Sequence, residues 1–264
     1  MSFFYELIQA LQELLFPAHC LGCEEQLMQL ASCRPPLLCP NCRKNVAVAT
    51  ICPPFCIRCG IPLVVGDNHL CLSCLDTPLA CITKVRSVRS SFLYQEPISA
   101  LVRQLKFTGN LTGLATLATL ARQTSSLMEL NEPDLILPVP LHLQRLRERG
   151  FNQSLLLARA CFPQWRKKIR FDLLQRQRAT VPQTRLNGKA RQTNLQQAFC
   201  MKTPQSLDVV QGKNILLVDD VFTTGSTLYE CAKVLLEAGA GEIDAFTVAR
   251  SAGLSINSGH PDNI

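Results

Sequence analysis

The pattern of apolar and polar residues in the C-terminal two thirds of the chain alternates between strand-like and helix-like segments. Apolar runs typical of strands occur at residues 82–94, 135–139, 215–218 and 243–248. Helical spacing of apolar residues occurs between and after these runs, at residues 97–107, 111–127, 153–162 and 226–238. This alternation predicts an α/β domain with a mainly parallel sheet flanked by helices.

The first sixteen residues have the amphipathic pattern of a helix. Its apolar side comprises Phe4, Leu7, Ile8, Leu11, Leu14 and Leu15. The segment carries Glu6 and Glu13 but no lysine or arginine, so it lacks the basic start of a secretory signal. No apolar run reaches the roughly 18 residues that a membrane-spanning helix needs. The sequence therefore predicts a cytoplasmic protein without a membrane span.

Cysteine usage changes sharply along the chain and suggests a domain boundary. Eleven of the fourteen cysteines lie between Cys20 and Cys81. Such density is typical either of a secreted disulfide scaffold or of a metal site, and the expected cytoplasmic location favours metal. We predict an N-terminal region over residues 1–82, a second domain over residues 83–250 and a frayed tail over residues 251–264.

Eight of these cysteines form four Cys-x-x-Cys pairs, Cys20/Cys23, Cys39/Cys42, Cys56/Cys59 and Cys71/Cys74. Two such knuckles complete a tetrahedral, all-cysteine zinc site with no open position for water, so we predict two structural zinc ions. The simplest pairing joins the first knuckle with the second and the third with the fourth. An interleaved cross-brace is the alternative.

The rest of the cysteine-rich region supports a structural function for the metal. Cys33, Cys52 and Cys81 are left over and are expected to be small buried residues. A segment with so few apolar side chains could hardly fold without metal. We expect the N-terminal region and the following domain to have separate cores.

The net charge of +7 is concentrated in one part of the chain. Between His142 and Arg191 there are thirteen basic residues and two acidic ones. Such a block is typical of a surface that binds a polyanion, either a multiply phosphorylated small molecule or a nucleic acid, although a solvated basic face has the same composition. Residues 175–199 have few apolar anchors and are predicted to form a long mobile loop.

The sharpest chemical signal follows the apolar run at residues 215–218. Asp219 and Asp220 come next, and a turn rich in hydroxyl groups leads into the predicted helix at residues 226–238. Ligands of open α/β sheets bind at the carboxyl ends of strands, and the N–H groups of such a turn can cradle a phosphate. The two carboxylates suit the hydroxyls of an attached sugar, or a magnesium ion. Both are expected to face a ligand and not to pair within the protein.

Three alternatives explain part of this acidic run. A Walker B strand also ends in acids, but the chain has no G-x-x-x-x-G-K-[ST] motif. A receiver domain also pairs acids after its first strand, but too few residues follow Asp220 to complete such a domain. Helix capping explains one or two of the polar residues, but not the whole run.

Residues 215–227 resemble the phosphoribosyl-pyrophosphate motif of type I phosphoribosyltransferases, and other segments narrow the resemblance to the ComF/GntX family. Leu-Pro-Val-Pro-Leu at residues 137–141 and the run at residues 145–153 are similar to that family's pyrophosphate-loop region. Residues 94–109 are similar to the segment that opens its catalytic domain. Its flexible-loop pattern is matched by Arg176, Thr180, Gln183, Leu186, Arg191, Asn194, Ala198 and Phe199. The double zinc ribbon is also a family trait.

The resemblance implies a type I phosphoribosyltransferase-like fold that binds phosphoribosyl pyrophosphate and magnesium and transfers the phosphoribosyl group to an unidentified acceptor, such as a base. Asp219 and Asp220 would hold the ribose hydroxyls and orient magnesium. The residues that would hold the 5-phosphate are Val221, Thr223, Thr224, Gly225, Ser226 and Thr227. Those that would meet the pyrophosphate are Val139, Pro140, Leu141, Arg145 and Arg149. A lid over residues 176–194, which includes Arg176 and Arg191, would close over the site and exclude water.

A non-catalytic function is the alternative. The same fold can serve as a nucleotide sensor or a nucleic-acid binder. Zinc ribbons and a basic block would suit single-stranded DNA or the DNA-uptake machinery, in line with the family's link to competence. Aromatic residues are sparse in the basic block, so a surface for stacking bases is not evident.

Overall fold

The computed structural model describes residues 18–27, 35–76, 85–177 and 198–252. The predicted N-terminal helix at residues 1–16 lies outside these ranges, as do most of the predicted mobile loop and all but two residues of the predicted tail. Among the described residues, no helix combines the length and the apolar character needed to cross a membrane.

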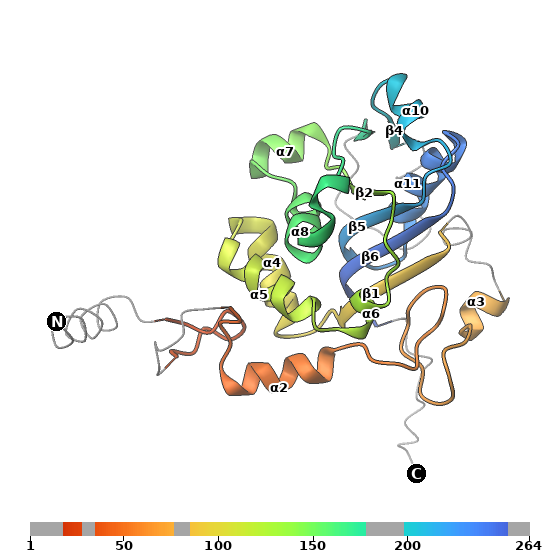
Figure 1. Ribbon diagram of the computed structural model, residues 1–264. Helices are drawn as coiled ribbons and strands as arrows, with labels where there is room; N and C mark the ends of the chain where they lie inside the picture. Colours follow the sequence, from red (N-terminus) through yellow and green to blue (C-terminus); the bar gives the residue numbers. More distant parts are fainter. Residues whose placement is uncertain (1–17, 28–34, 77–84, 178–197, 253–264) are drawn as a thin grey trace, which may run out of the picture.

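A four-stranded sheet forms the centre of the C-terminal domain (Figure 1). Its strands are β1 (Ser87–Leu93), β2 (Leu135–Pro138), β5 (Ile215–Phe222) and β6 (Ile243–Arg250). Their order across the sheet is β1-β6-β5-β2, and every neighbouring pair is parallel. The predicted α/β class with a mainly parallel sheet is therefore confirmed.

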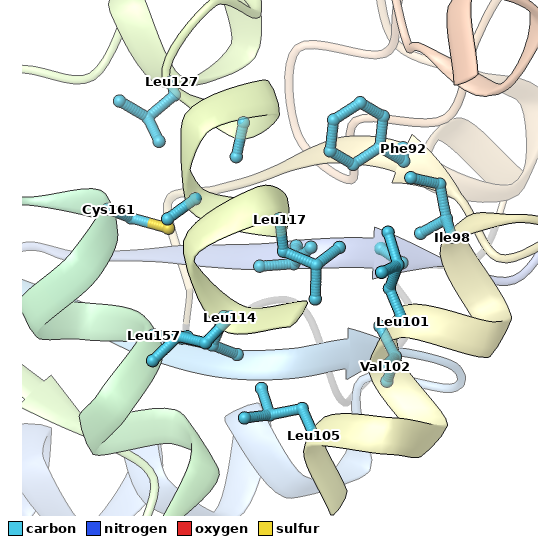
Figure 2. Close-up of a cluster of buried hydrophobic side chains, with 14 of the residues drawn as sticks. Phe92, Ile98, Leu101, Val102, Leu105, Leu114, Leu117, Leu127, Leu157 and Cys161 are labelled. Carbon is cyan, nitrogen blue, oxygen red and sulfur yellow. The ribbon is translucent and has the colours of Figure 1, made fainter. Parts of the chain in front are cut away.

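Alternate residues of β5 face two different hydrophobic clusters, because side chains of a strand point to opposite faces. Leu216 and Val218 pack with α4 (Ile98–Thr108), α5 (Leu111–Ala121) and α8 (Gln153–Cys161). Figure 2 shows the apolar side chains of these helices converging over the strands, among them Leu101, Leu105, Leu114, Leu117 and Leu157.

The other face of the sheet is covered by α11 (Ser226–Glu237), whose Leu228, Cys231 and Leu235 pack with Ile215 and Leu217. The short helix α10 (Gln205–Val210) adds Val210 to the same cluster. An antiparallel pair, β3 (Leu174–Arg176) and β4 (Phe199–Met201), also packs here. Both faces of the sheet are thus buried, as a parallel sheet requires.

Three local features differ from the sequence expectations. The single helix expected at residues 111–127 is two helices, α5 and α6 (Ser125–Met128), because the extended backbone of Thr124 (φ −88°, ψ 143°) interrupts it. Helix α7 (Leu143–Arg149) was not predicted, since none of its side chains is buried and it has no apolar face to detect. Strand β5 continues to Phe222, so the two acids lie within the strand and not after it.

The cysteine-rich region runs antiparallel along the outer edge of β1. Thr50 forms a bridge with Phe92, and the Ile51 N–H donates to the Ser91 carbonyl at 2.9 Å. Further along, the Val88 N–H donates to the Arg58 carbonyl at 2.7 Å. Helix α2 (Pro40–Ala49) lies before this segment, and α3 (Leu72–Asp76) after it (Figure 1). This segment covers part of an edge strand that would otherwise expose unpaired backbone groups.

The expectation of separate cores is wrong. Cys20, Cys39 and Cys42 belong to the same hydrophobic cluster as α4 and α5, whereas Cys56, Cys59 and Cys74 belong to the cluster of α11. The region has too few apolar side chains for a core of its own, so it completes its burial against the sheet domain. The boundary near residue 82 marks a change in composition, and as a domain boundary it stays a prediction.

Candidate functional site

Two groups of four thiols lie in the cysteine-rich region, and each brings two knuckles together. The first group is Cys20, Cys23, Cys39 and Cys42, and the second is Cys56, Cys59, Cys71 and Cys74. Within each group, all sulfur atoms lie within 4.8 Å of one another. The predicted sequential pairing is confirmed, and the cross-brace is excluded for these residues.

The surroundings of the thiols fit zinc. The N–H groups of Gly22 and Cys39 donate to the Cys20 sulfur at 3.4 and 3.2 Å. Burial raises the pKa of the Cys20 thiol, but these N–H donors, together with Cys23, outweigh it and lower the pKa to about 7. Burial and the neighbouring thiols raise the pKa of Cys42, so the four sulfur atoms need a cation among them to ionise together. Thiolates are the form of cysteine that binds metal, and four of them leave no open ligand position, which suits a structural ion.

Of the three leftover cysteines, only Cys52 lies among the described residues, and it belongs to neither group. Cys52 is exposed, so the expectation that it is buried is wrong. Cys33 and Cys81 lie outside the described residues.

Asp219 and Asp220 lie near the carboxyl end of β5, and each has a different set of partners. Asp220 is 5% exposed, and its Oδ2 forms an ion pair with Lys106 Nζ at 2.9 Å. The same oxygen accepts from Gln153 Nε2 at 3.4 Å. Asp219 Oδ1 accepts from the Ser154 hydroxyl and from the Asp220 N–H, both at 2.9 Å. The expectation that the acids do not pair within the protein is therefore wrong.

The electrostatic states of the two acids differ. Burial, reinforced by the charge of Asp220, raises the pKa of Asp219 to about 7. Lys106 offsets the charge of Asp220 directly. Two carboxylates so close together resist carrying full charge at once, so the site favours a ligand that brings a cation or hydroxyl donors.

Helix α8 begins beside the acids and orients their partners. Asn152 caps this helix by accepting from the N–H groups of Ser154 and Leu155, at 2.9 and 3.4 Å. The Asn152 amide also donates to the Val139 carbonyl at 3.0 Å, and the Val139 N–H donates to the Val218 carbonyl at 2.9 Å. The cap therefore joins the loop after β2, which continues through Pro140 and Leu141, to the end of β5.

Arginines lie on the side of the acids formed by α7 and β3. Arg149 Nη1 donates to Gln153 Oε1 at 3.1 Å, so Gln153 links Arg149 to Asp220. Burial and the neighbouring charge of Arg145 lower the pKa of Arg149. Mutual repulsion of partly buried guanidinium groups is relieved by an anion, which is the chemistry expected of a pyrophosphate site.

Arg176 lies at the end of β3, beside the start of α7. It forms a bridge with His142, and its guanidinium group lies over the Phe199 ring at 5.4 Å from the centroid. Burial and the charge of Arg145 lower the pKa of Arg176, while Asp219 opposes this shift. The structure thus brings Arg145, Arg149 and Arg176 near the acid pair, whereas Arg191 lies outside the described residues.

The predicted phosphate-binding turn connects β5 to α11. Gly225 has φ of 77°, a left-handed conformation that favours glycine, and it is the N-cap position of the 12-residue helix α11. The hydroxyls of Thr224 and Ser226 lie 2.9 Å apart, within hydrogen-bonding distance. Thr223 is exposed, while Val221 pairs with Ala249 inside the sheet. The first N–H groups of α11 point out of the helix N-terminus directly after β5, which is the geometry of an anion site.

Sequence reasoning missed three residues of this site, Lys106, Gln153 and Ser154. Lys106 and Gln153 lie in segments that resemble the family and Ser154 directly follows one, but no local sequence pattern indicates that the end of α4 and the start of α8 meet at β5. One signal is Gly109, with φ of 62°, where an added Cβ would lie 2.8 Å from Phe151 Cε1. This close contact holds the end of α4 against the loop before α8.

A groove of about 410 Å³ lies at the opposite end of the sheet, against the cysteine-rich region. It is lined by the starts of β1 and β6 and by Arg58, Arg86 and Arg89. Arg86 is already paired with Glu242 and Asp244. Acids thus offset its basic lining, and the groove lies away from the carboxyl ends where ligands of parallel sheets bind.

Comparison with known protein families matches two parts of the chain. The phosphoribosyl transferase domain family matches residues 168–258, and the double zinc ribbon domain family matches residues 11–75. The first match includes the acid pair and the turn, and the second includes all eight cysteines of the two groups.

Named relatives match most of the chain. DNA utilization protein YhgH of Escherichia coli is 35% identical over 238 residues, which cover 83% of this chain and 95% of that protein. Competence protein F of Haemophilus influenzae is 32% identical over 219 residues, covering 81% and 90%. Competence protein ComFC of Bacillus subtilis is 29% identical over 248 residues, covering 88% and 95%. With such coverage, the similarity includes both the cysteine-rich region and the sheet domain.

Proposed function

The chain belongs to the ComF/GntX family, and from that premise we propose that it binds phosphoribosyl pyrophosphate with magnesium at the carboxyl end of β5 and transfers the phosphoribosyl group to an acceptor, such as a base. The observation that supports this most is the acid pair on β5, with arginines on one side and a glycine-containing turn directly after it. A sugar that carries a phosphate at one end and a pyrophosphate at the other matches these three features.

In this proposal each part of the ligand meets a different element. The ribose hydroxyls donate to Asp219 and Asp220, and the 5-phosphate accepts from the N–H groups and hydroxyls of residues 223–227. The pyrophosphate lies toward Arg145, Arg149 and Arg176. The carboxylates of Asp219 and Asp220 would hold magnesium, which supplies positive charge to the leaving pyrophosphate.

The reaction breaks the bond between the anomeric carbon and the pyrophosphate oxygen, and a bond to the acceptor nucleophile forms. Positive charge develops on the sugar and negative charge on the leaving group. The protein contributes by holding the two reactants in line and by placing guanidinium groups where the negative charge develops. Their planar geometry allows two hydrogen bonds to one phosphate group.

Lys106 occupies the position beside Asp220 that a ligand needs. A ribose hydroxyl or a magnesium ion can approach Asp220 Oδ2 only if the ammonium group moves away, since it lies 2.9 Å from that oxygen. We therefore propose that Lys106 takes the place of a cation in the ligand-free protein and moves toward the pyrophosphate when ligand binds. Because its side chain is long and partly exposed, this movement needs no change in the fold.

A second candidate function is suggested by the names of the relatives, which refer to DNA utilization and to competence. In this alternative the same fold senses nucleotides or handles single-stranded DNA without turnover, together with the DNA-uptake machinery. The reduced cysteine groups support a cytoplasmic location for either function.

One experiment separates the two functions. Purified zinc-loaded protein is incubated with phosphoribosyl pyrophosphate, magnesium and a panel of bases, and pyrophosphate release is measured. Release that depends on one acceptor, and that is lost in Asp219→Asn/Asp220→Asn, supports transfer. Salt-sensitive binding of single-stranded DNA, with no release for any acceptor, supports the DNA-handling function and counts against transfer.

A further inference from the structure

The second cysteine group and the predicted phosphate-binding turn are joined by one buried side chain, that of Arg250. This residue ends β6 and is 4% exposed. Its Nη1 donates to the Cys59 carbonyl at 2.5 Å, and its guanidinium group lies over the Phe222 ring at 5.1 Å from the centroid. One planar group therefore contacts a zinc knuckle and the end of the central strand.

Phe222 is the last residue of β5 and lies directly before the turn at residues 223–227. Its side chain is buried, and its backbone is paired with Arg250 in the sheet. The Ser251 N–H donates to the Phe222 carbonyl at 2.9 Å. The position of this ring and this carbonyl fixes where the turn begins, so whatever holds Arg250 also holds the first residue of the turn.

The knuckle on the other side of Arg250 is fixed against the sheet. Gly60, directly after Cys59, has φ of 71°, and an added Cβ would lie 2.5 Å from the Val88 carbonyl oxygen. The knuckle therefore approaches β1 closely and has little freedom to slide along it.

The second cysteine group also offers an anionic partner for the charge of Arg250. A buried guanidinium group is costly without an anionic partner. Four thiolates outweigh the charge of one zinc ion, so the metal-loaded group of Cys56, Cys59, Cys71 and Cys74 fits such a partner.

We propose that Arg250 transmits the position of the second zinc ribbon to the phosphate-binding turn, which makes it a positioning residue. Arg250 acts through Phe222 and does not touch the ligand. The order of the turn is measured in the ligand-free protein, so this part of the proposal does not depend on which ligand the site binds. The consequence for phosphate affinity rests on the proposed function.

Arg89 provides a matched control. It lies on β1, its Nη1 donates to the Ile57 carbonyl at 3.0 Å, and its guanidinium group lies over the Phe55 ring at 4.9 Å from the centroid. It therefore makes the same two kinds of contact as Arg250, a hydrogen bond to a carbonyl of the same ribbon and a contact over a phenylalanine ring. The rings differ, because Phe55 belongs to the ribbon itself and Phe222 leads into the turn.

The test is amide hydrogen exchange on the full zinc-loaded chain. The N–H groups of Tyr229 and Ser251 donate to the Gly225 and Phe222 carbonyls, so their exchange reports on the order of the turn. Arg250→Met should make these two amides exchange about tenfold faster, since a lost hydrogen bond from a charged group is worth at least about a factor of ten. Arg89→Met should leave that exchange unchanged and speed exchange only near residues 55–59. Zinc content is measured for each variant, and two ions per chain are expected in both.

A second pair of variants covers the case in which methionine prevents folding. Arg250→Lys keeps the charge but loses the planar group over Phe222, so exchange of the turn should still rise, by a smaller factor, whereas Arg89→Lys should leave it unchanged. Equal exchange of the turn in the Arg250 and Arg89 variants would overturn the proposal.

Binding of ribose 5-phosphate gives the second measurement. If the wild type binds it, Arg250→Met should bind about tenfold more weakly and Arg89→Met with wild-type affinity. Equal affinity in all three proteins contradicts the inference about affinity. If the wild type binds neither ribose 5-phosphate nor phosphoribosyl pyrophosphate, the proposed function fails, and the exchange result still decides the inference about the turn.

Discussion

Lys106 at the end of α4 and Asp220 on β5 form an ion pair, with 2.9 Å between Nζ and Oδ2, in the middle of the candidate site. The side chains are 26% and 8% exposed, so the pair is shielded from solvent more than an ordinary surface pair. Asp220 would otherwise be a buried carboxylate beside a second carboxyl group. The lysine therefore stabilises the ligand-free site, and in the proposed function it moves away when a ligand binds Asp220.

Replacing this lysine should have opposite effects on stability and on metal binding. Lys106→Met removes the partner of a buried carboxylate, and we expect a loss of about 1–2 kcal/mol in the free energy of unfolding. It also removes the cation that competes for Asp220, so magnesium alone should bind more tightly. Urea denaturation and calorimetric titration with magnesium measure the two effects.

The control for this variant lies on the same helix. Arg103 pairs with Glu96 at 2.6 Å, and both side chains are half-exposed. Arg103→Met should cost less than about 1 kcal/mol and leave magnesium binding unchanged. If the Lys106 and Arg103 variants behave alike, the lysine has no special relationship with the site.

Replacing Asp219 and Asp220 one at a time should have different effects on stability. Asp219→Asn keeps an acceptor for Ser154 and removes repulsion from Asp220, so stability should be unchanged or slightly higher. Asp220→Asn loses the ion pair with Lys106 and should be less stable. Both should bind phosphoribosyl pyrophosphate at least about tenfold more weakly, since each loses a charge-assisted hydrogen bond to the sugar. Loss of stability without loss of affinity would assign the acids a purely structural function.

Stability should depend on pH in a direction set by Asp219. Its pKa is raised in the folded protein from 3.8 to about 7, chiefly by burial, so between these values the folded state binds more protons than the unfolded state. The free energy of unfolding should therefore fall as pH rises from about 4 to about 7. Asp219→Asn should make this part of the profile flatter, and an unchanged profile would show that Asp219 does not titrate in this range.

Loss of zinc should lower the stability of the sheet domain as well as that of the cysteine-rich region. Metal analysis should find about two zinc ions per chain. Cys56→Ser should lose one of them and lower the stability of the sheet domain as well, because Cys56 packs in the same cluster as α11. Cys52→Ser is the control, since Cys52 is exposed and lies in neither group. Retention of both ions in Cys56→Ser would contradict the second zinc site.

The sequence predicted those elements whose apolar pattern is strong. Strand β6 and helices α4 and α11 were expected at nearly their observed positions, and β5 was expected at its observed start but four residues too short. Helix α7 was missed because none of its side chains is buried, so burial left no periodic trace in the sequence. The shared cores were missed because the cysteines were considered only as metal ligands, whereas Cys39 and Cys56 also pack against the sheet domain.

The candidate site was predictable only where its residues are neighbours in the chain. The acids and the turn follow one strand, so a local pattern indicated them together. Lys106 lies more than a hundred residues before Asp220, and a lysine at a helix end has no distinctive local signal. Its pairing with Asp220 depends on the packing of α4 against the sheet.

The most direct test of the account is binding of phosphoribosyl pyrophosphate with magnesium, measured as a thermal shift. At about 100 times its dissociation constant the ligand should stabilise the wild type by about 2.7 kcal/mol, and ribose 5-phosphate at the same concentration should stabilise it less. Asp219→Asn/Asp220→Asn should show little or no shift. No shift in the wild type at millimolar ligand, or an equal shift in the double variant, would contradict a phosphoribosyl pyrophosphate site at the end of β5.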